Sequence, residues 1–188
     1  PLEPGLYLVS TPIGNLGDIT LRGLETLAGT DIIACEDTRV SRVLLDRFGI
    51  TTRPYAYHEH NAERVGPKLM QALDAGKSVA LISDAGTPLV SDPGYRISQT
   101  AIEAGIAVIP IPGASAPMAA LVASGLPSDT FLFAGFLPSK DKARRDRYAG
   151  FTTTEATLMF FESPNRLAAS LKSAAEVARV IGEDLSAV

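Results

Sequence analysis

Residues 83–94, with the sequence SDAGTPLVSDPG, combine the residue types that could bind a small molecule at the end of a strand. The segment follows an apolar run and holds two glycines, two prolines, two aspartates, two serines and a threonine. Glycine lets the backbone approach a ligand closely, and proline fixes the shape of a loop without offering an N–H group. This composition favours binding of a flat or elongated small molecule by main-chain groups.

Two further segments share this composition, STPIGNLGD at residues 10–18 and PGASA at residues 112–116, and each follows an apolar run. Tight turns between strands and helices would explain any one of the three. Ligands of open parallel sheets sit beyond the carboxyl ends of the strands. Three such loops at one sheet edge therefore favour a ligand cleft.

The nucleotide-binding motifs narrow the kind of ligand. The chain has neither GxxxxGK[ST] nor GxGxxG, and Gly14 and Gly17 alone are a weak signal. Glu36 and Asp37 come about 20 residues after these glycines in the sequence, which is the spacing at which dinucleotide folds place an acid that binds the ribose. An adenosine-type ligand without phosphate fits both observations, and S-adenosylmethionine is such a ligand.

The elements that must position these loops alternate along the chain. Apolar runs predict strands at residues 5–10, 31–36, 78–83 and 106–111, with a weaker extended piece at 53–59. Helical spacing predicts helices at 19–29, 38–49, 61–76 and 95–105. Continuously apolar strands separated by helices indicate a parallel sheet covered on both faces. We expect an N-terminal α/β domain over residues 1–111.

A second α/β domain is expected over residues 112–188. It would hold a small-residue helix after the Pro-Gly turn at 112–113, strands at 130–138 and 156–163, and a final helix at 164–182. The charged segment between the strands, 139–150, fits a helix or a loop. Because only two strands are evident, we expect this second domain to be incomplete.

Long stretches of the chain resemble the tetrapyrrole methylase superfamily. They include LYLVSTPIGNLGDITLRGLETL, DIIACEDTRVSRVLL, YHEHN, LISDAGTPLVSDPGYR, PIPGASAPMAALVASGLP, FAGFLPSK and LMFFESPNRL. The resemblance runs from about residue 6 to 167 and is nearest to the branch that 2'-O-methylates a cytidine of 16S rRNA in the small ribosomal subunit. It implies a homodimer of two α/β domains, with S-adenosylmethionine in the cleft between the domains.

The resemblance also implies donor-binding positions. These are Pro12, Ile13, Gly14, Gly86, Thr87, Pro88, Val90, Ser115, Ala116 and Phe161. Gly86-Thr87-Pro88 has Thr where many members have Asp, so Ser83 and Asp84 are expected to supply polar side chains instead. On this interpretation the loop 83–94 forms the floor of the methyl-donor site.

Polar residues near the predicted acceptor fall in two stretches. Glu36 or Asp37 could orient a ribose hydroxyl, and Arg39 could hold a phosphate. A helix cap at Asp37 or Thr38, with Arg39 paired to a nearby acid, explains the pattern equally well. In YHEHN, His58 is a general-base candidate and Asn61 an RNA contact. His58 and His60 alone are a poor metal signal, so no metal is expected.

Basic residues of the second domain offer further RNA contacts. The segment 139–150 holds Arg144 and Arg145 among five basic residues, and ESPNR holds Arg166. A solvated helix face is the ordinary explanation of such a charged run, and a phosphate-gripping arm is the alternative. For Arg166, the alternative is a structural role at the start of a helix, with Ser163 as the N-cap and Pro164 as the first helical residue.

Composition limits the other possibilities. The net charge of −4 gives no general attraction to nucleic acid. The single cysteine, Cys35, excludes an internal disulfide and fits a reducing cytoplasm, where we expect the protein to work. There is no apolar run long enough to span a membrane and no signal-peptide pattern, and the Pro at position 1 suggests a piece of a longer product.

Two other functions stay open. One is methylation of a small molecule such as a tetrapyrrole, and the other is a truncated, non-catalytic module that binds S-adenosylmethionine. A nucleotide-dependent oxidoreductase is disfavoured by the missing GxGxxG.

Overall fold

The computed structural model describes residues 2–91 and 94–182, except for the side chain of residue 181. The chain forms two compact units, Pro1–Ala116 and Pro117–Val188, and each is described here by itself. The turn at 112–116, where the sequence pattern placed the domain boundary, lies with the first unit. Its Gly113 packs so closely against Ser10 that an added Cβ would be 2.9 Å from the Ser10 Cβ.

The first unit is built on one five-stranded sheet. Its strands are β1 (Gly5–Val9), β2 (Ile32–Cys35), β3 (Pro54–Ala56), β4 (Ser78–Ile82) and β5 (Val108–Ile111), in the order β3-β2-β4-β1-β5. Every neighbouring pair is parallel, as the apolar runs predicted. β4 is buried along its whole length, because a central parallel strand is covered on both faces.

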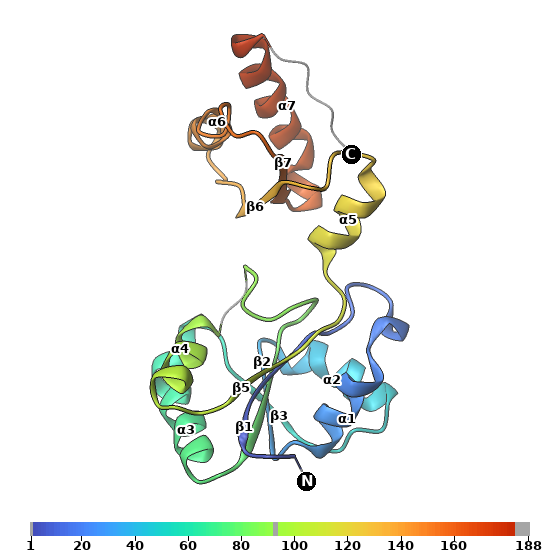
Figure 1. Cartoon of the computed structure of the whole chain (residues 1–188), viewed down its shortest axis with the longest axis vertical. Helices are drawn as coiled ribbons and strands as arrows, with labels where there is room; N and C mark the ends of the chain where they lie inside the picture. The colour runs from blue at the N-terminus through green and yellow to red at the C-terminus, as the bar shows by residue number, and fades with distance from the viewer. Residues whose placement is uncertain (1, 92–93, 183–188) are drawn as a thin grey trace. The chain divides into compact units, whose positions relative to one another are not determined.

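Four helices cover the two faces of this sheet (Figure 1). α1 (Leu21–Gly29) and α2 (Thr38–Arg47) lie on one face, and α3 (Ala62–Asp74) and α4 (Tyr95–Glu103) lie on the other. Short 3-10 helices at Leu16–Asp18 and Glu59–Asn61 precede α1 and α3. Each face buries its own apolar cluster, one including Leu27 and Leu45, the other Leu69 and Ile97. The doubly covered α/β fold predicted for this part of the chain is confirmed.

Side chains fix where the helices of this unit begin. Thr20 Oγ1 accepts a hydrogen bond from the Gly23 N–H at the start of α1. Asp37 Oδ1 accepts from the Arg39 N–H at the start of α2. Both satisfy N–H groups that have no partner inside the helix. These caps set the point where the loops after β1 and β2 end.

The second unit holds two strands and three helices in its described residues. They are α5 (Ala116–Ser124), β6 (Phe131–Phe136), α6 (Asp141–Ala149), β7 (Thr157–Phe161) and α7 (Pro164–Ile181). β6 and β7 are parallel, and their register shifts between Phe133 and Phe136, where Gly135 has a φ of +68°. The charged segment 139–150, open between helix and loop in the sequence, is mainly helix α6.

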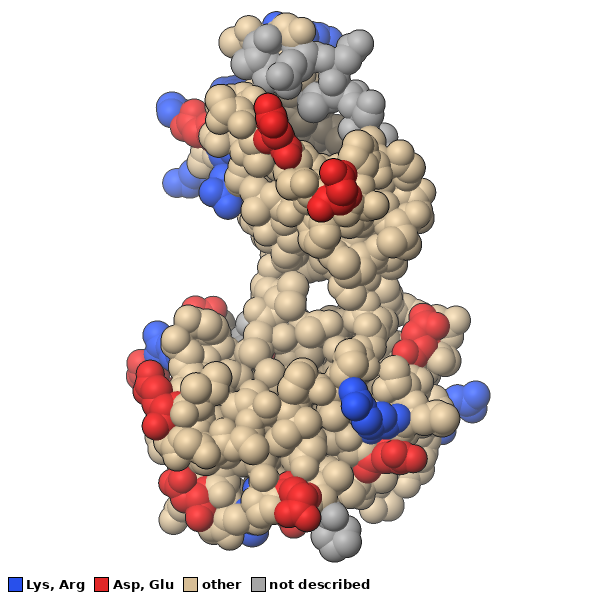
Figure 2. Space-filling view, viewed as in Figure 1, with Lys and Arg blue, Asp and Glu red and all other residues tan. Residues whose placement is uncertain are grey.

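On the face shown in Figure 2, the described Lys, Arg, Asp and Glu residues are scattered among uncharged ones and form no large surface of a single sign. Any binding of polyanions through that face must therefore depend on local clusters. None of the described helices is both long and apolar enough to cross a lipid bilayer.

Candidate functional site

The three glycine- and proline-rich loops follow neighbouring strands of the first unit. Residues 10–18 follow β1, the loop 83–94 follows β4, and residues 112–116 follow β5. β1 pairs with β4 on one side and with β5 on the other, all in parallel. The carboxyl ends of the three strands therefore meet, and the three loops leave the same edge of the sheet, where ligands of such sheets bind.

Direct hydrogen bonds join the first two loops. The Thr11 N–H donates to the Gly86 carbonyl at 2.9 Å, and the Gly86 N–H donates back to the Thr11 carbonyl at 3.1 Å. Thr11 Oγ1 donates to the Ser83 carbonyl at 3.1 Å, and Ser10 Oγ donates to Thr87 Oγ1, also at 3.1 Å. Ser10, Thr11 and Ser83 are all buried, so these contacts form a fixed floor.

Glycine is required where the loops come closest. Gly86 has a φ of +83°, and a Cβ added there would lie 3.3 Å from Ile13 Cγ2. The Ala114 carbonyl of the third loop would be 3.7 Å from the same Cβ. A side chain at residue 86 would therefore strain the backbone and crowd Ile13 of the first loop, whereas the Ala114 carbonyl would be at an ordinary contact distance.

The long loop holds unusual backbone conformations beyond Gly86. Leu89 and Ser91, which are not glycines, have φ values of +73° and +63°. Left-handed backbone at such residues is unfavourable and concentrates at ligand-binding segments. Pro88 is buried and Val90 is 38% exposed, so this part of the loop presents Val90 outward. Asp92 and Pro93 of the quoted motif lie outside the described residues.

A pocket of about 470 Å³ opens between the first two loops and α2. The predicted residues Pro12, Ile13, Gly14, Ser83 and Asp84 line it. Three apolar residues of α2, which were not among the predicted site residues, complete the wall: Val40, Val43 and Leu44. Val40 and Val43 are exposed, and apolar positions beyond the core-facing stripe are the signal that could have found them.

At the rim of this pocket, Asp84 links two strand ends. Its Oδ1 accepts a hydrogen bond of 3.0 Å from the Asp37 N–H. The Asp37 carboxylate turns to Arg39, whose Nη2 donates to Asp37 Oδ2 at 2.6 Å. Hydrogen bonds from the Arg39 side chain and N–H lower the pKa of Asp37 from 3.8 to about 2. Asp37 is thus both the cap of α2 and the ion-pair partner of Arg39.

The other predicted catalytic residues lie apart from this pocket wall. Glu36 directly follows β2 and is half-buried. The His58 N–H donates to Asn61 Oδ1 at 2.9 Å, and His58 Nε2 lies 3.3 Å from Asn61 Nδ2. Asn61 Nδ2 also donates to the Ala56 carbonyl. The carboxamide of Asn61 therefore holds the turn around His58, so its predicted RNA contact would compete with bonds within the chain.

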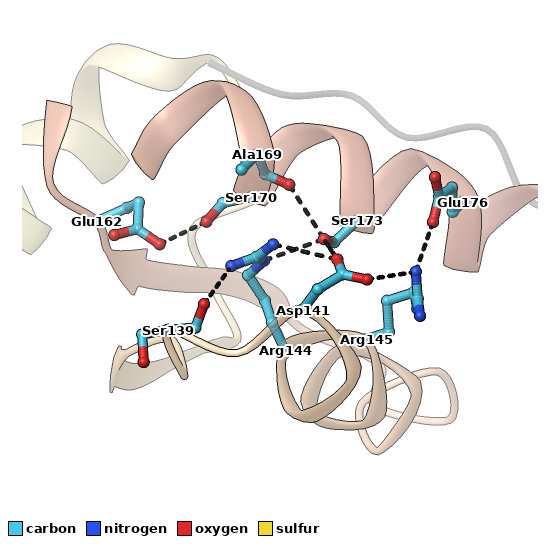
Figure 3. Close-up of polar contacts among 9 residues, drawn as sticks. All are labelled: Ser139, Asp141, Arg144, Arg145, Glu162, Ala169, Ser170, Ser173 and Glu176. Carbon is cyan, nitrogen blue, oxygen red and sulfur yellow. Dashed lines mark hydrogen bonds and ion pairs between the residues drawn. The ribbon is translucent and has the colours of Figure 1, made fainter. Parts of the chain in front are cut away.

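Arg144, predicted as an RNA contact, is buried in the second unit (Figure 3). Its guanidinium donates to Ser173 Oγ on α7, to the Ser139 carbonyl and to Asp141 Oδ1. All three nitrogens are used within the unit, so the structure gives Arg144 a structural place between α6 and α7. A phosphate-gripping role is incompatible with this arrangement, because a phosphate could not reach the buried head group.

The neighbouring Arg145 is partly exposed and forms two ion pairs. Its Nη1 lies 2.6 Å from Asp141 Oδ2 and 3.1 Å from Glu176 Oε2 (Figure 3). The hydrogen bond from Ser173, followed by the charges of Arg145 and Arg144, lowers the pKa of Asp141. Arg145 is thus tied to α7 and is only in part available to another anion.

The segment after β7 is also internally connected. Arg166 Nη2 lies 2.8 Å from Glu162 Oε1, and its Nε donates to Ser163 Oγ. Glu162 also accepts from Ser170. Burial alone would raise the pKa of Glu162, but the hydrogen bonds from Ser170 and the Ser163 N–H, with the Arg166 charge, lower it. The Arg166 side chain is therefore already bound to Glu162 and Ser163 at the start of α7.

Phe161 and the third loop complete the predicted donor positions. Phe161 is half-buried at the end of β7 and stacks edge-on with Phe133 at 4.8 Å between ring centroids. Ser115 and Ala116 are half-buried at the junction to α5. Their contacts to a ligand stay predictions.

Among the described residues there is neither a cluster of metal ligands nor a reactive thiol. Within residues 2–91 and 94–182, no three His, Cys, Asp or Glu side chains are placed to hold one metal ion. Cys35 is buried in β2, and burial raises the pKa of its thiol. A raised thiol pKa disfavours the reactive thiolate, so Cys35 acts as a core residue.

Solved structures with a similar fold are known. A conserved hypothetical protein from Aeropyrum pernix aligns with a TM-score of 0.71 at 21% identity, covering 97% of this chain and 69% of that one. The uroporphyrin-III-C-methyltransferase of Thermus thermophilus aligns with a TM-score of 0.61 at 19% identity, covering 96% and 74%. At such identities these similarities concern the fold alone.

Curated relatives are much closer in sequence. A protein of Mesorhizobium japonicum is 70% identical over 94% of this chain, and one of Escherichia coli O157:H7 is 50% identical over 95% of it. Both bear the name ribosomal RNA small subunit methyltransferase I. The chain spans 60% and 61% of the length of these two relatives.

The family model described as tetrapyrrole (corrin/porphyrin) methylases matches residues 5–188. This match includes both units and all three loops at the sheet edge. The chain therefore belongs to the tetrapyrrole methylase family.

Proposed function

We propose that this chain carries the donor site of an S-adenosylmethionine-dependent methyltransferase that 2'-O-methylates a cytidine ribose in 16S rRNA of the small ribosomal subunit. The observation that carries the proposal is the hydrogen-bonded junction of the β1 and β4 loops at Thr11 and Gly86. The chain that holds this junction belongs to a family of methylases, and the two relatives at 70% and 50% identity have names that specify small-subunit ribosomal RNA.

The loops suit a donor that is recognised mainly by backbone groups. Gly14 has a φ of +138° and open space where a side chain would stand, so its peptide groups are accessible to a ligand. The close approach of Gly86 to Ile13 gives the site a fixed floor. S-adenosylmethionine would supply an electrophilic methyl group on a sulfonium, which needs positioning more than activation.

The pocket beside Ile13 and Asp84 is the proposed place of the nucleoside to be methylated. Its volume of about 470 Å³ lies within the range of small-molecule sites, and its apolar α2 wall suits the face of a base. Asp84 at the rim, a predicted donor-binding residue, is placed to accept a hydrogen bond from a ribose hydroxyl of the methyl donor beside that nucleoside. Asp37, with a pKa of about 2 and a bound Arg39, is too weak a base at neutral pH to take the proton of the hydroxyl that is methylated. It serves instead to orient Arg39 and, through its N–H, Asp84.

The expected homodimer and the cytoplasmic location belong to the same proposal. Ribosomal subunits occupy the cytoplasm, so an enzyme acting on them would work there. Light scattering of the purified chain measures its oligomeric state. A mass of one chain at micromolar concentration would count against the dimer and leave the donor site untouched.

Calorimetric titration with S-adenosylhomocysteine, with NAD as the control, tests the donor site first. We expect saturable binding of the first ligand alone. Transfer of a tritiated methyl group to small ribosomal subunits then tests the acceptor, and a 2'-O-methyl group makes the adjacent phosphodiester resistant to alkali. Binding of NAD instead would contradict the methyltransferase assignment, and transfer to a tetrapyrrole but not to RNA would favour the small-molecule alternative.

A further inference from the structure

A second pocket lies on the other side of the α2 N-terminal turn, at the outer edge of the sheet. Its volume is about 440 Å³, and it is lined by Thr38, Arg39, Arg42, Arg53, Pro54, Tyr55 and Ala56. β3 is the edge strand next to β2, and α2 runs back from the end of β2. The pairing of β3 with β2 thus brings residues 53–56 beside the first turns of α2.

Three arginines in one small pocket make a local cationic site on a chain with a net charge of −4. The three arginines differ in how strongly a neighbouring carboxylate already neutralises their charge. Arg39 makes three side-chain hydrogen bonds to the Asp37 carboxylate. Arg42 lies 3.9 Å from Asp46, at the outer limit of an ion pair, with both side chains largely exposed.

Arg53 has no ion pair or side-chain hydrogen bond with any residue that the structure describes. It is exposed at the start of β3. The guanidinium of Arg53 therefore has no internal partner among the described residues, and that of Arg42 has only a long, solvent-exposed ion pair with Asp46, so both can bind an anion. Guanidinium groups match phosphate oxygens with paired N–H donors, so phosphate is the anion that this arrangement suits.

An aromatic ring stands in the same pocket. Tyr55 is 53% exposed, although β3 around it is part of the sheet. Exposed aromatic rings beside arginines are a common platform for unstacked RNA bases, because every base has a π-face. A phosphate site with an adjacent stacking ring suits a single-stranded polynucleotide better than a free phosphate ion.

α2 lines both pockets with different residues. Val40, Val43 and Leu44 face the first pocket, whereas Thr38, Arg39 and Arg42 face the second. One helix therefore separates the proposed nucleoside pocket from the arginine pocket. A strand of RNA entering the first pocket would pass the α2 N-terminal turn and bring its backbone to the second.

We propose that Arg42, Arg53 and Tyr55 form a binding site for the RNA strand that flanks the methylated nucleotide. Arg42 and Arg53 would contact its phosphates, and Tyr55 would stack on one of its bases. This inference rests on the proposed function, since it assumes an RNA acceptor. It assigns the RNA contact to residues that were not among those predicted from the sequence motifs.

Fluorescence anisotropy with labelled single-stranded RNA from the small-subunit RNA tests the site. The double variant Arg42→Ala with Arg53→Ala should bind several-fold more weakly at 50 mM salt. The slope of log K against log salt should fall by about 1.4, because each phosphate of a single strand that is no longer neutralised lowers it by about 0.7. Tyr55→Ala should weaken binding with an unchanged slope, because stacking releases no counterion.

The matched control is the double variant Arg64→Ala with Lys68→Ala, which removes two exposed positive charges from α3 on the opposite face of the sheet. It should leave both the affinity and the slope unchanged. Thermal unfolding and S-adenosylhomocysteine binding of every variant should equal those of the unmodified chain, so a folding defect would be visible.

The outcomes separate this inference from the proposed function. RNA binding by the unmodified chain that is unaffected in the double variant would overturn the arginine site alone. Equal weakening by the Arg64→Ala, Lys68→Ala variant would also overturn it, because the effect would then be one of total charge. An unmodified chain that binds S-adenosylhomocysteine but no RNA would overturn both the site and the RNA acceptor while leaving the donor site standing.

Discussion

The peptide groups of Thr11 and Gly86 hydrogen-bond to each other in both directions, at 2.9 and 3.1 Å. This two-way contact joins the loop after β1 to the loop after β4, which are far apart in sequence. It fixes the distance between Ile13 on one loop and Asp84 on the other, and both residues line the same pocket. The geometry of the proposed donor site therefore depends on backbone contacts more than on any one side chain.

Gly86→Ala should weaken binding of S-adenosylhomocysteine at least fivefold and destabilise the chain by about 1–2 kcal/mol. The destabilisation follows from the left-handed backbone at φ +83°, and the weaker binding follows from the new Cβ at 3.3 Å from Ile13. Calorimetry and thermal unfolding measure the two effects. Gly76→Ala is the matched control, since Gly76 has a φ of +77° but open space around its Cβ position. Equal loss of affinity in both variants would refute a specific role for Gly86.

Asp84→Ala should reduce affinity for S-adenosylhomocysteine about three- to tenfold without unfolding the protein. The carboxylate accepts from the Asp37 N–H at 3.0 Å, and its removal frees the two strand ends from each other. Asp84→Asn keeps an acceptor oxygen and should retain most of the affinity. Affinity equal to that of the unmodified chain in a folded Asp84→Ala variant would reject the role.

The loop junction follows from the sequence pattern, because apolar runs predict parallel strands and parallel strands bring their carboxyl ends together. The apolar stretches before Ser10, Ser83 and Pro112 were enough to predict that three loops meet. The arginine pocket could not be predicted in this way. It depends on β3 pairing with β2 at the sheet edge, and the short extended piece around Tyr55 carries no signal for its partner strand.

The position of Arg144 shows another limit. A run of basic and acidic residues predicts a solvated helix face, and Arg145 and Asp146 on the same helix fit that expectation. Arg144 is buried because Ser173, on α7, offers a hydroxyl to its Nε at 3.0 Å. Because Ser173 lies 29 residues further along the chain, on another helix, the sequence around Arg144 gives no sign that this arginine is buried.

The Asp37–Arg39 pair should persist to low pH. The pKa of Asp37 falls from 3.8 to about 2 because the Arg39 side chain and N–H donate to its carboxylate. Since the folded-state pKa is the lower one, the contact stabilises the fold above about pH 4, and this contribution disappears as the pH falls toward 2. NMR titration of the Asp37 carboxyl carbon measures this pKa.

Arg39→Ala provides the comparison for that titration. In the variant, Asp37 should titrate nearer to its ordinary value, although part of the lowering should remain. High salt should also reduce the shift in the unmodified chain, since the Arg39 side chain is 90% exposed. A midpoint near 3.8 in the unmodified chain would contradict the ion pair.

Arg144→Ala should destabilise the second unit by about 3 kcal/mol, whereas Arg145→Ala should cost less than about 1 kcal/mol. Arg144 is buried and uses all three guanidinium nitrogens, so its removal leaves Ser173 and the Ser139 carbonyl without this donor. Arg145 is 41% exposed, and solvent screens its pairs with Asp141 and Glu176. The two substitutions remove the same charge from adjacent positions of α6, so the difference between them reflects the burial and the internal hydrogen bonds of Arg144 rather than net charge. Amide hydrogen exchange in α6 and α7 measures it, and equal exchange rates in the two variants would show that the Arg144 contacts contribute nothing beyond a surface pair.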